Sequence, residues 1–286
     1  MMKTRWVLTA LLCVLLRVPG AGQEPPFHFA LLADTQMGMY ASDRDFVRET
    51  ANYEFAAATV NRLRPEFVVI LGDLVNRPGD PDQVREFKRI TSRITVPVHL
   101  VAGNHDIGHE PTPESLAAYR RDFGRDYYSF RAGPVYGIVL NSGLIHSPRK
   151  VADEYARQAA WLREELAAAR KSGAPHVIVF QHHPWFVADA GEADGYSNIP
   201  AARRQPMLEL LREYGVRQVF AGHAHQDSTG RAGDLEMTVT GPVSMPFGDR
   251  GSGMRLVEVG PGGVRHRYFD FSRMPDALSL EHRSPF

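Results

Sequence analysis

The sequence of 286 residues has a single cysteine, Cys13, and no excess of either charge, with Lys+Arg and Asp+Glu at 33 each. Cys13 lies in an N-terminal segment that we expect to be removed, so the mature chain has no disulfide, no thiolate nucleophile and no cysteine metal site. The balanced charge provides no general basic field to attract nucleic acid or acidic membranes. We therefore expect no nucleic acid as a structural partner.

Long apolar runs are also missing. The candidate WVLTALLCVLL (6–16) has about 11 residues, whereas a transmembrane helix needs roughly 20. The basic stretch MMKTR precedes it and the small residues of VPGAG follow it, which is typical of a secretory signal peptide. We predict a signal peptide at 1–22, export to the periplasm or the medium, and no transmembrane helix in the mature chain. An uncleaved N-terminal membrane anchor is the alternative.

Apolar runs typical of strands alternate with helical patterns along most of the chain. For example, FHFALLA (27–33) precedes a helical pattern at 45–64, and EFVVILG (66–72) precedes one at 81–94. This alternation predicts an α/β protein whose early strands are parallel and buried on both faces. The short late strands predict a second, mostly antiparallel sheet. No internal repeat or low-complexity linker divides the chain, so we predict one domain over 23–286, two packed sheets flanked by helices, and a monomer.

Five polar stretches directly follow five of the apolar runs. They are ADTQ (33–36), GDLVN (72–76), GNHD (103–106), QHHPW (181–185) and GHAH (222–225). Any one of them could be an ordinary turn or a hydrogen-bonded buried histidine. Because ligands bind beyond the carboxyl ends of strands in α/β sheets, we expect all five to converge. Asp, Asn, Gln and His without Cys suit Mn, Fe or Zn, and Mg less well.

The spacing of the last stretch indicates two metals rather than one. His223 and His225 are two residues apart, so on an extended segment both side chains point to one face. The pair could then reach two neighbouring metal ions, and the carboxylate of Asp73 could bridge them.

This series of motifs resembles that of the calcineurin-like metallophosphoesterases, from about residue 27 to 271. The segments FGRDYYSF, VLNSGLIHSPRK and TVTGPVSMPFGDRGSGMRLVEVG resemble one branch, the calcineurin-like phosphoesterase-domain-containing proteins related to a serine/threonine phosphatase. The resemblance implies a four-layer α/β/β/α sandwich of two mixed sheets flanked by helices.

The resemblance also implies roles for the motif residues. The first metal would be bound by Asp34, Gln36, Asp73 and His225, and the second by Asp73, Asn104, His182 and His223. His183 would lie on the substrate side. His105 would contact the scissile phosphate or protonate the leaving group, and Asp106 would orient its imidazole. Much of the family has histidine where this chain has Gln36, whereas the resembling branch has glutamine, so we expect Gln36 to bind weakly or through water.

The predicted reaction is hydrolysis of a phosphate monoester by a hydroxide that bridges two metals. The substrate would be a small phosphate ester or a phosphoprotein. A phosphodiesterase acting on nucleotides or glycerophosphodiesters is one alternative, and a non-catalytic metal-binding or interaction domain is another. Loops 75–81 and 186–200 could shape the substrate pocket. Tyr40, Tyr196, Trp185 and Phe186 could line its mouth, although an aromatic beside a proline more often packs in the core. Arg77 or Arg44 could hold a phosphate, although a surface arginine is more often a solvated charge.

Overall fold

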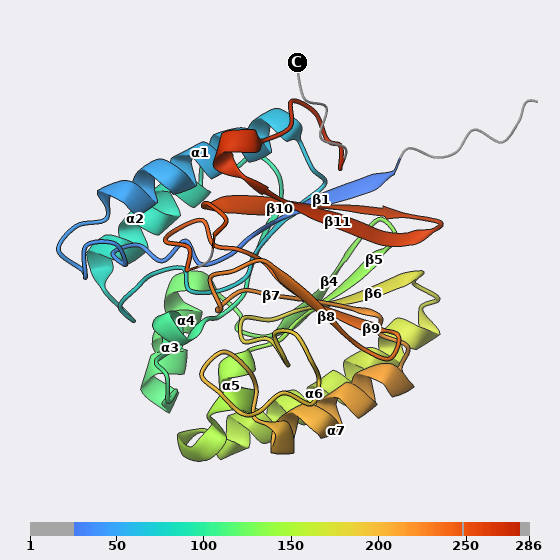
Figure 1. Ribbon diagram of the computed structural model, residues 1–286. Helices are drawn as coiled ribbons and strands as arrows, with labels where there is room; N and C mark the ends of the chain where they lie inside the picture. The colour runs from blue at the N-terminus through green and yellow to red at the C-terminus, as the bar shows by residue number, and fades with distance from the viewer. Residues whose placement is uncertain (1–25, 248, 281–286) are drawn as a thin grey trace, which may run out of the picture.

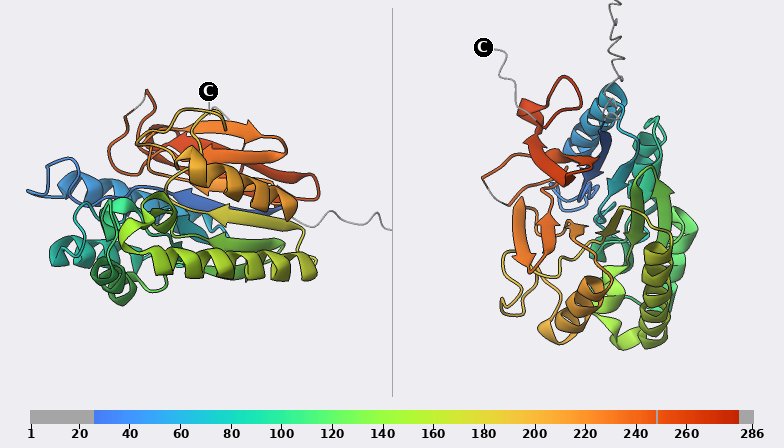
Figure 2. Two further views of the ribbon diagram at one scale, coloured as in Figure 1. Left: turned by 90° about the horizontal axis from the view of Figure 1, so that it is seen from below. Right: turned by 90° about the vertical axis from the view of Figure 1, so that its right-hand side faces the viewer.

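The computed structural model describes residues 26–247 and 249–280, so the predicted signal peptide lies outside the described residues. Two sheets pack face to face, and helices cover the outer face of each (Figures 1 and 2). The predicted sandwich of two mixed sheets flanked by helices is confirmed. In the described part of the chain, no helix combines the length and hydropathy that a bilayer span requires.

The first sheet has the strand order β11-β10-β1-β2-β3. Its strands are β1 (Phe27–Leu32), β2 (Val68–Ile70), β3 (Val98–Leu100), β10 (Gly253–Gly260) and β11 (Gly263–Asp270). β1, β2 and β3 are parallel, as their continuous apolar runs predict, and β10 pairs antiparallel with both β1 and β11. The parallel arrangement places the residues that follow β1, β2 and β3 at one edge of the sheet.

The second sheet has the order β4-β5-β6-β7-β9-β8. Its strands are β4 (Tyr128–Ala132), β5 (Val135–Val139), β6 (His176–Phe180), β7 (Gln218–Ala221), β8 (Ser228–Ala232) and β9 (Leu235–Val239). β5, β6, β7 and β9 are parallel, and the hairpins β4–β5 and β8–β9 are antiparallel.

The prediction that the late strands form their own antiparallel sheet is wrong. β8 and β9 complete the second sheet, while β10 and β11 extend the first. An apolar pattern shows that a strand is buried, but it carries no information on which sheet edge the strand will pair with.

Helices form the two outer layers. The helices are α1 (Val47–Leu63), α2 (Pro81–Thr91), α3 (Asn104–Ile107), α4 (Pro113–Phe123), α5 (Ser142–His146), α6 (Ala152–Lys171) and α7 (Ala201–Glu213), with 3₁₀ turns η1 (Pro148–Lys150) and η2 (Phe271–Arg273). α1 and α2 cover the first sheet, and α6 and α7 cover the second (Figure 1). The sequence did not predict α3, α5 or β8, each of which has five residues or fewer and lies outside the apolar runs and helical patterns.

Three apolar layers hold the sandwich together. In β1, Phe29 and Leu31 face the second sheet and contribute to the layer between the sheets, whereas Ala30 and Leu32 pack in the layer that contains α1 and α2. A third layer joins the second sheet to α6 and α7. β1 is therefore buried on both faces, and it ends at Leu32, just before Asp34.

Candidate metal centre

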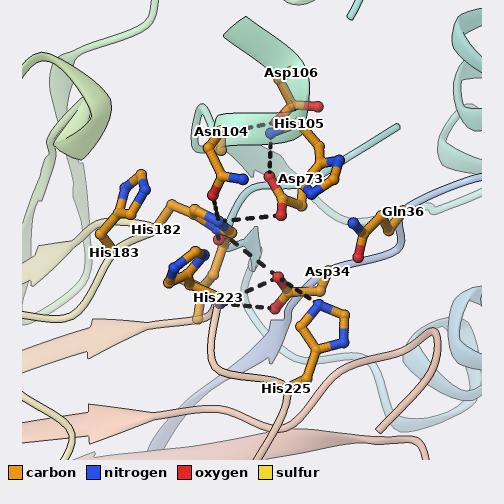
Figure 3. A network of polar contacts seen from close by, with 12 residues as sticks. Asp34, Gln36, Asp73, Asn104, His105, Asp106, His182, His183, His223 and His225 are labelled. Atoms are coloured by element: carbon orange, nitrogen blue, oxygen red, sulfur yellow. Dashed lines mark hydrogen bonds and ion pairs between the residues drawn. The ribbon is translucent and has the colours of Figure 1, made fainter. Parts of the chain in front are cut away.

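The five polar stretches converge at the ends of their strands, as predicted (Figure 3). Asp34 follows β1, Asp73 follows β2, and Asn104 begins α3 just after β3. His182 and His223 follow β6 and β7 of the other sheet. The centre therefore lies where the two sheets meet, and each sheet contributes side chains to it.

Two groups of buried side chains could each hold a metal ion. One group contains Asp73, His182 and His223, and the other contains Asp34, Asp73 and His225. Within each group the ligand atoms lie within 4.8 Å of one another. Asp73 belongs to both groups, which is what the predicted bridging role requires of it.

An amide adds an oxygen to the first of these groups. The Oδ1 atom of Asn104 lies 3.0 Å from Nε2 of His182, and the same nitrogen lies 3.3 Å from Oδ2 of Asp73. His225 is placed similarly, with Nε2 3.4 Å from Oδ1 of Asp34. Imidazole nitrogens and side-chain oxygens thus face one another in both groups, an arrangement that suits a cation between them.

Backbone carbonyls orient the histidines of the centre. Each of four rings has one nitrogen within hydrogen-bond distance of a carbonyl oxygen. The pairs are His105 Nδ1 with Asn76 (2.7 Å), His182 Nδ1 with Leu71 (2.8 Å), His223 Nε2 with Tyr196 (2.9 Å) and His225 Nδ1 with Met245 (2.6 Å). A carbonyl can only accept, so the bonded nitrogen carries the proton and the other nitrogen is left for a metal or substrate.

The nearby carboxylates raise the pKa values of the histidines in the centre, whereas burial lowers them. Burial disfavours the imidazolium of His182, but the charges of Asp73 and Asp34 outweigh burial and raise its pKa to about 9. Burial and the neighbouring His182 lower the pKa of His223 to about 4. The same cluster holds the pKa of Asp73 well below its usual range despite burial. A metal at Nε2 of His182 would compete with a proton for that nitrogen.

The backbone at the centre is strained. Eight non-glycine residues in the described part of the chain have positive φ, and five of them are predicted metal ligands. These five are Asp34 (51°), Gln36 (39°), Asp73 (50°), His223 (71°) and His225 (52°). Such a conformation costs about 1–3 kcal/mol per residue and persists only where the surroundings enforce it. Most of the backbone strain in the described residues thus lies at predicted metal ligands.

The side-chain oxygen of Gln36 is buried without a hydrogen-bond partner in the described part of the chain and is suited to bind a cation. Its Nε2 donates to Oδ1 of Asn76 at 3.2 Å, while its Oε1 is buried and has no hydrogen-bond partner among the described residues. In Figure 3 this oxygen faces the space beside Asp34. A buried carbonyl oxygen without a partner costs about 1–3 kcal/mol. A metal bound by Asp34, Asp73 and His225 would satisfy it, so the donor set fits a dinuclear centre.

Asp106 does not orient the imidazole of His105, and that prediction is wrong. Oδ1 of Asp106 accepts from the backbone N–H groups of Leu74 and Val75, and Oδ2 accepts from that of Gly103. Asp106 instead joins the loop after β2 to the start of α3. The carbonyl of Asn76 orients His105, a partner that a sequence motif cannot reveal because any residue supplies a carbonyl.

Of the predicted substrate residues, two lie in the core and one lies beside the centre. Trp185 is fully buried in the layer beneath the second sheet, as is Phe186, so the prediction that they line the pocket mouth is wrong. His183 lies beside the centre but in neither metal group; its Nδ1 bonds Oγ of Ser142 at 2.9 Å. Trp185, which follows Pro184, thus fills the core rather than a pocket.

Tyr40 and the two arginines have contacts away from the ligand atoms. The hydroxyl of Tyr40 donates to the carbonyl of Ser244, and the guanidinium of Arg48 lies 3.8 Å from its ring centroid. Nε of Arg77 lies 3.8 Å from carboxylate oxygens of both Asp43 and Asp80. Nε of Arg44 donates to the carbonyl of Ala41.

Two exposed aromatic side chains border the centre. The Tyr196 ring centroid lies 4.8 Å from that of His223, and the Phe247 ring stacks on His225 at 4.6 Å. Tyr196 lies in loop 186–200, which was predicted to shape the substrate pocket. Phe247 and His109, whose ring lies 5.2 Å from His105, were missed. His109 lies outside the five polar stretches, and Phe247 lies in a segment that indicated only a resemblance to the family branch.

The family model for calcineurin-like phosphoesterases matches residues 27–227. The chain belongs to this family. It is 34% identical to the human serine/threonine-protein phosphatase CPPED1 over 269 residues, covering 88% of this chain and 86% of that protein. It is also 29% identical to purple acid phosphatase 15 of Arabidopsis thaliana over 182 residues, 59% of this chain and 31% of that one. Both the family and the predicted branch are thereby confirmed.

The fold agrees with this assignment. A dimetal phosphatase from Danio rerio superposes with a TM-score of 0.61 at 17% identity, covering 87% of this chain and 100% of that one. The calcineurin-like phosphoesterase described here is accordingly a metal-dependent phosphoric ester hydrolase with a dinuclear metal centre.

Gly103→Ala should disrupt this centre. A Cβ at position 103 would meet the backbone nitrogen and Oδ1 of Asp73, and neither can move without displacing the shared ligand. We expect the protein to retain fewer than two metal ions, measured by elemental analysis after dialysis, and to unfold at a lower temperature.

The matched control is Gly262→Ala, because a Cβ at position 262 meets no atom within 4 Å. It should bind metal as the unmodified protein does. Two tightly held metal ions in the Gly103→Ala protein would contradict the close packing of Gly103 on Asp73.

Proposed function

We propose that this phosphoesterase is a phosphatase that hydrolyses phosphate monoesters. The observation that carries the proposal is the single carboxylate, Asp73, shared by two adjacent metal-binding groups. Two neighbouring metals are a recurrent solution for in-line displacement at phosphorus. The relatives named as phosphatases support the monoester, and hydrolysis of diesters remains the alternative that the experiment below separates.

The residues divide between the metals as follows. Asp34, Gln36, Asp73 and His225 would hold the first metal, and Asp73, Asn104, His182 and His223 would hold the second. When bound, the metals supply an activated water and neutralise charge on the phosphoryl oxygens. Nitrogen and oxygen donors without sulfur favour Mn, Fe or Zn over Mg.

His105 would protonate the leaving oxygen. Its backbone N–H donates to Oδ1 of Asp73 at 2.8 Å, which ties it to the centre. Its Nδ1 is held by the carbonyl of Asn76, so Nε2 is the atom left to face the substrate. An imidazolium at this position can give the Nε2 proton to the departing alkoxide, and a general acid of this kind contributes about 10²–10⁴-fold to the rate.

The decisive test compares p-nitrophenyl phosphate with bis(p-nitrophenyl) phosphate, using protein reconstituted in turn with Mn²⁺, Zn²⁺, Fe²⁺ and Mg²⁺. We expect higher kcat/KM for the monoester. Asp73→Asn should abolish turnover by at least about 10³-fold, because it weakens both metal groups. Asp45→Asn, an equal charge change in an exposed loop, should leave turnover unchanged.

Two bound metals without turnover of either ester would refute the enzyme and favour the non-catalytic metal-binding domain. Faster turnover of the bis ester would favour the phosphodiesterase. His105→Ala should lower kcat with p-nitrophenyl phosphate less than with an alkyl phosphate, because p-nitrophenolate leaves without protonation.

The rim of the centre favours substrates with a planar apolar group. Tyr196 and Phe247 are 62% and 63% exposed, and they belong to only four large apolar side chains that are exposed in the described residues. Their rings contact metal-site histidines of different groups. A planar group esterified to the bound phosphate could stack on either ring, which would stabilise binding by about 0.5–1.5 kcal/mol beyond burial alone.

Benzyl phosphate and cyclohexylmethyl phosphate provide the test, because they have similar size and leaving groups of similar basicity. We expect kcat/KM to be about 3- to 10-fold higher for benzyl phosphate. Phe247→Leu and Tyr196→Leu should reduce this ratio, whereas Phe55→Leu, an exposed phenylalanine that packs on Phe271, should not. Equal kcat/KM for the two esters would rule out stacking at the rim.

We also propose that the enzyme is exported. The support is the basic, apolar and small-residue order of the N-terminal 22 residues. N-terminal sequencing of protein recovered outside the cytoplasm should find a chain that begins near residue 23. A full-length chain held in the membrane fraction would favour the uncleaved anchor.

A further inference from the structure

The orientation of the Gln36 amide decides whether Gln36 can bind a cation. A carboxamide has an oxygen that can bind a metal and an NH₂ group that cannot. The two ends have nearly the same shape, so packing alone does not choose between them. Side chains around Gln36 must therefore select the end that faces the metal.

The first side chain whose orientation is fixed is Gln83 of α2. Its Oε1 accepts from the backbone N–H groups of Asn76 and Arg77, both at 2.9 Å. Backbone N–H groups can only donate, so Gln83 must direct its oxygen toward them. Its Nε2 then donates to Oδ1 of Asp43 at 2.7 Å. Gln83 is 2% exposed, so water does not offer an alternative arrangement.

Asp43 fixes the orientation of the Asn76 amide. An ionised carboxylate is an acceptor only, and Oδ1 of Asp43 accepts from Nδ2 of Asn76 at 2.8 Å. With its NH₂ group turned to Asp43, Asn76 must turn Oδ1 toward Gln36. That oxygen accepts from Nε2 of Gln36 at 3.2 Å. Gln36 is left with Oε1 on the side of Asp34, where it has no hydrogen-bond partner among the described residues.

The loop before α1 packs closely against this chain of amides. Gly38 has a φ of +108°, and a Cβ there would lie 2.7 Å from Nε2 of Gln83 and 2.8 Å from Oδ1 of Asp43. The backbone N–H of Asp43 in turn donates to the carbonyl of Gly38 at 2.8 Å. Arg77 approaches the other carboxylate oxygen, Oδ2, and does not compete for Oδ1. The packing of the loop at Gly38 therefore holds Gln83 and Asp43 in these positions.

We propose that Asp43, Asn76 and Gln83 are positioning residues that hold the Gln36 amide with its oxygen toward the first metal. This inference rests on the proposed ligand role of Gln36. It explains how an amide can serve at a position where much of the family has histidine: the chain from Gln83 to Gln36 admits only one orientation. Without it, the amide could also rest with its NH₂ group toward the metal site, and metal binding would then have to turn the amide over.

Calorimetric titration of the metal-free protein with Mn²⁺ tests the proposal, and Mn²⁺ electron paramagnetic resonance reports each site without reference to activity. We expect two sites in the unmodified protein. Asp43→Asn lets residue 43 donate as well as accept, which removes the selection. Affinity at one site should fall about 10-fold, within the range for partners of metal ligands, and the other site should not change.

A double-mutant cycle shows whether Asp43 acts through Gln36. Gln36→Ala should weaken the same site, and adding Asp43→Asn should then cause no further loss. Asp45→Asn is the matched control, since it removes the same charge two residues away and should leave both affinities unchanged. Asn76→Ala, which keeps the carbonyl that holds His105, should reproduce the effect of Asp43→Asn and replaces it if that variant does not fold.

Unchanged affinities in both Asp43→Asn and Asn76→Ala would overturn the proposal. A further loss in the Gln36→Ala background would also overturn it, because Asp43 would then act through its charge or through the fold. Fewer than two Mn²⁺ in the unmodified protein would refute the dinuclear assignment itself. The two failures are thus distinguished by the first titration.

Discussion

The rest of the centre depends on the position of one carboxylate, that of Asp73. It lies between two clusters of ligands, and its Oδ1 also accepts the backbone N–H of His105. A displacement of Asp73 would therefore disturb both metal-binding groups and His105 together. The strained backbone at Asp73 and the close approach of Gly103 show that the local fold is arranged around this side chain.

The histidines are organised by a different principle. Carbonyl oxygens from Leu71, Asn76, Tyr196 and Met245 each hold one ring. A carbonyl fixes the position of the proton without adding a charge, so the rings keep a free nitrogen for the metal or the substrate. Loops that carry no recognisable motif, such as 186–200, thereby become part of the centre through their backbone. The side chain of Tyr196, whose carbonyl holds His223, is itself exposed at the edge of the centre.

The sequence predicts those parts of the molecule that depend on strand ends. Asp34, Asp73, Asn104, His182 and His223 each follow an apolar strand, so their convergence could be predicted before the fold was known. The pairing of β10 with β1 could not, because burial of a strand does not identify its neighbours. The partners of Asp106 and His105 could not be predicted either, since both bond to backbone atoms. Trp185 was misplaced because an aromatic residue beside a motif is equally suited to the core.

Both metal groups draw ligands from both sheets: Asp34, Asp73 and Asn104 follow strands of the first sheet, and His182, His223 and His225 follow strands of the second. A bound metal is therefore a cross-link between the two halves of the sandwich, in a chain whose single cysteine cannot form an internal disulfide. Binding that favours the folded state adds to its stability in proportion to the logarithm of metal concentration. The supply of metal would then govern the lifetime of the folded protein as well as its catalysis.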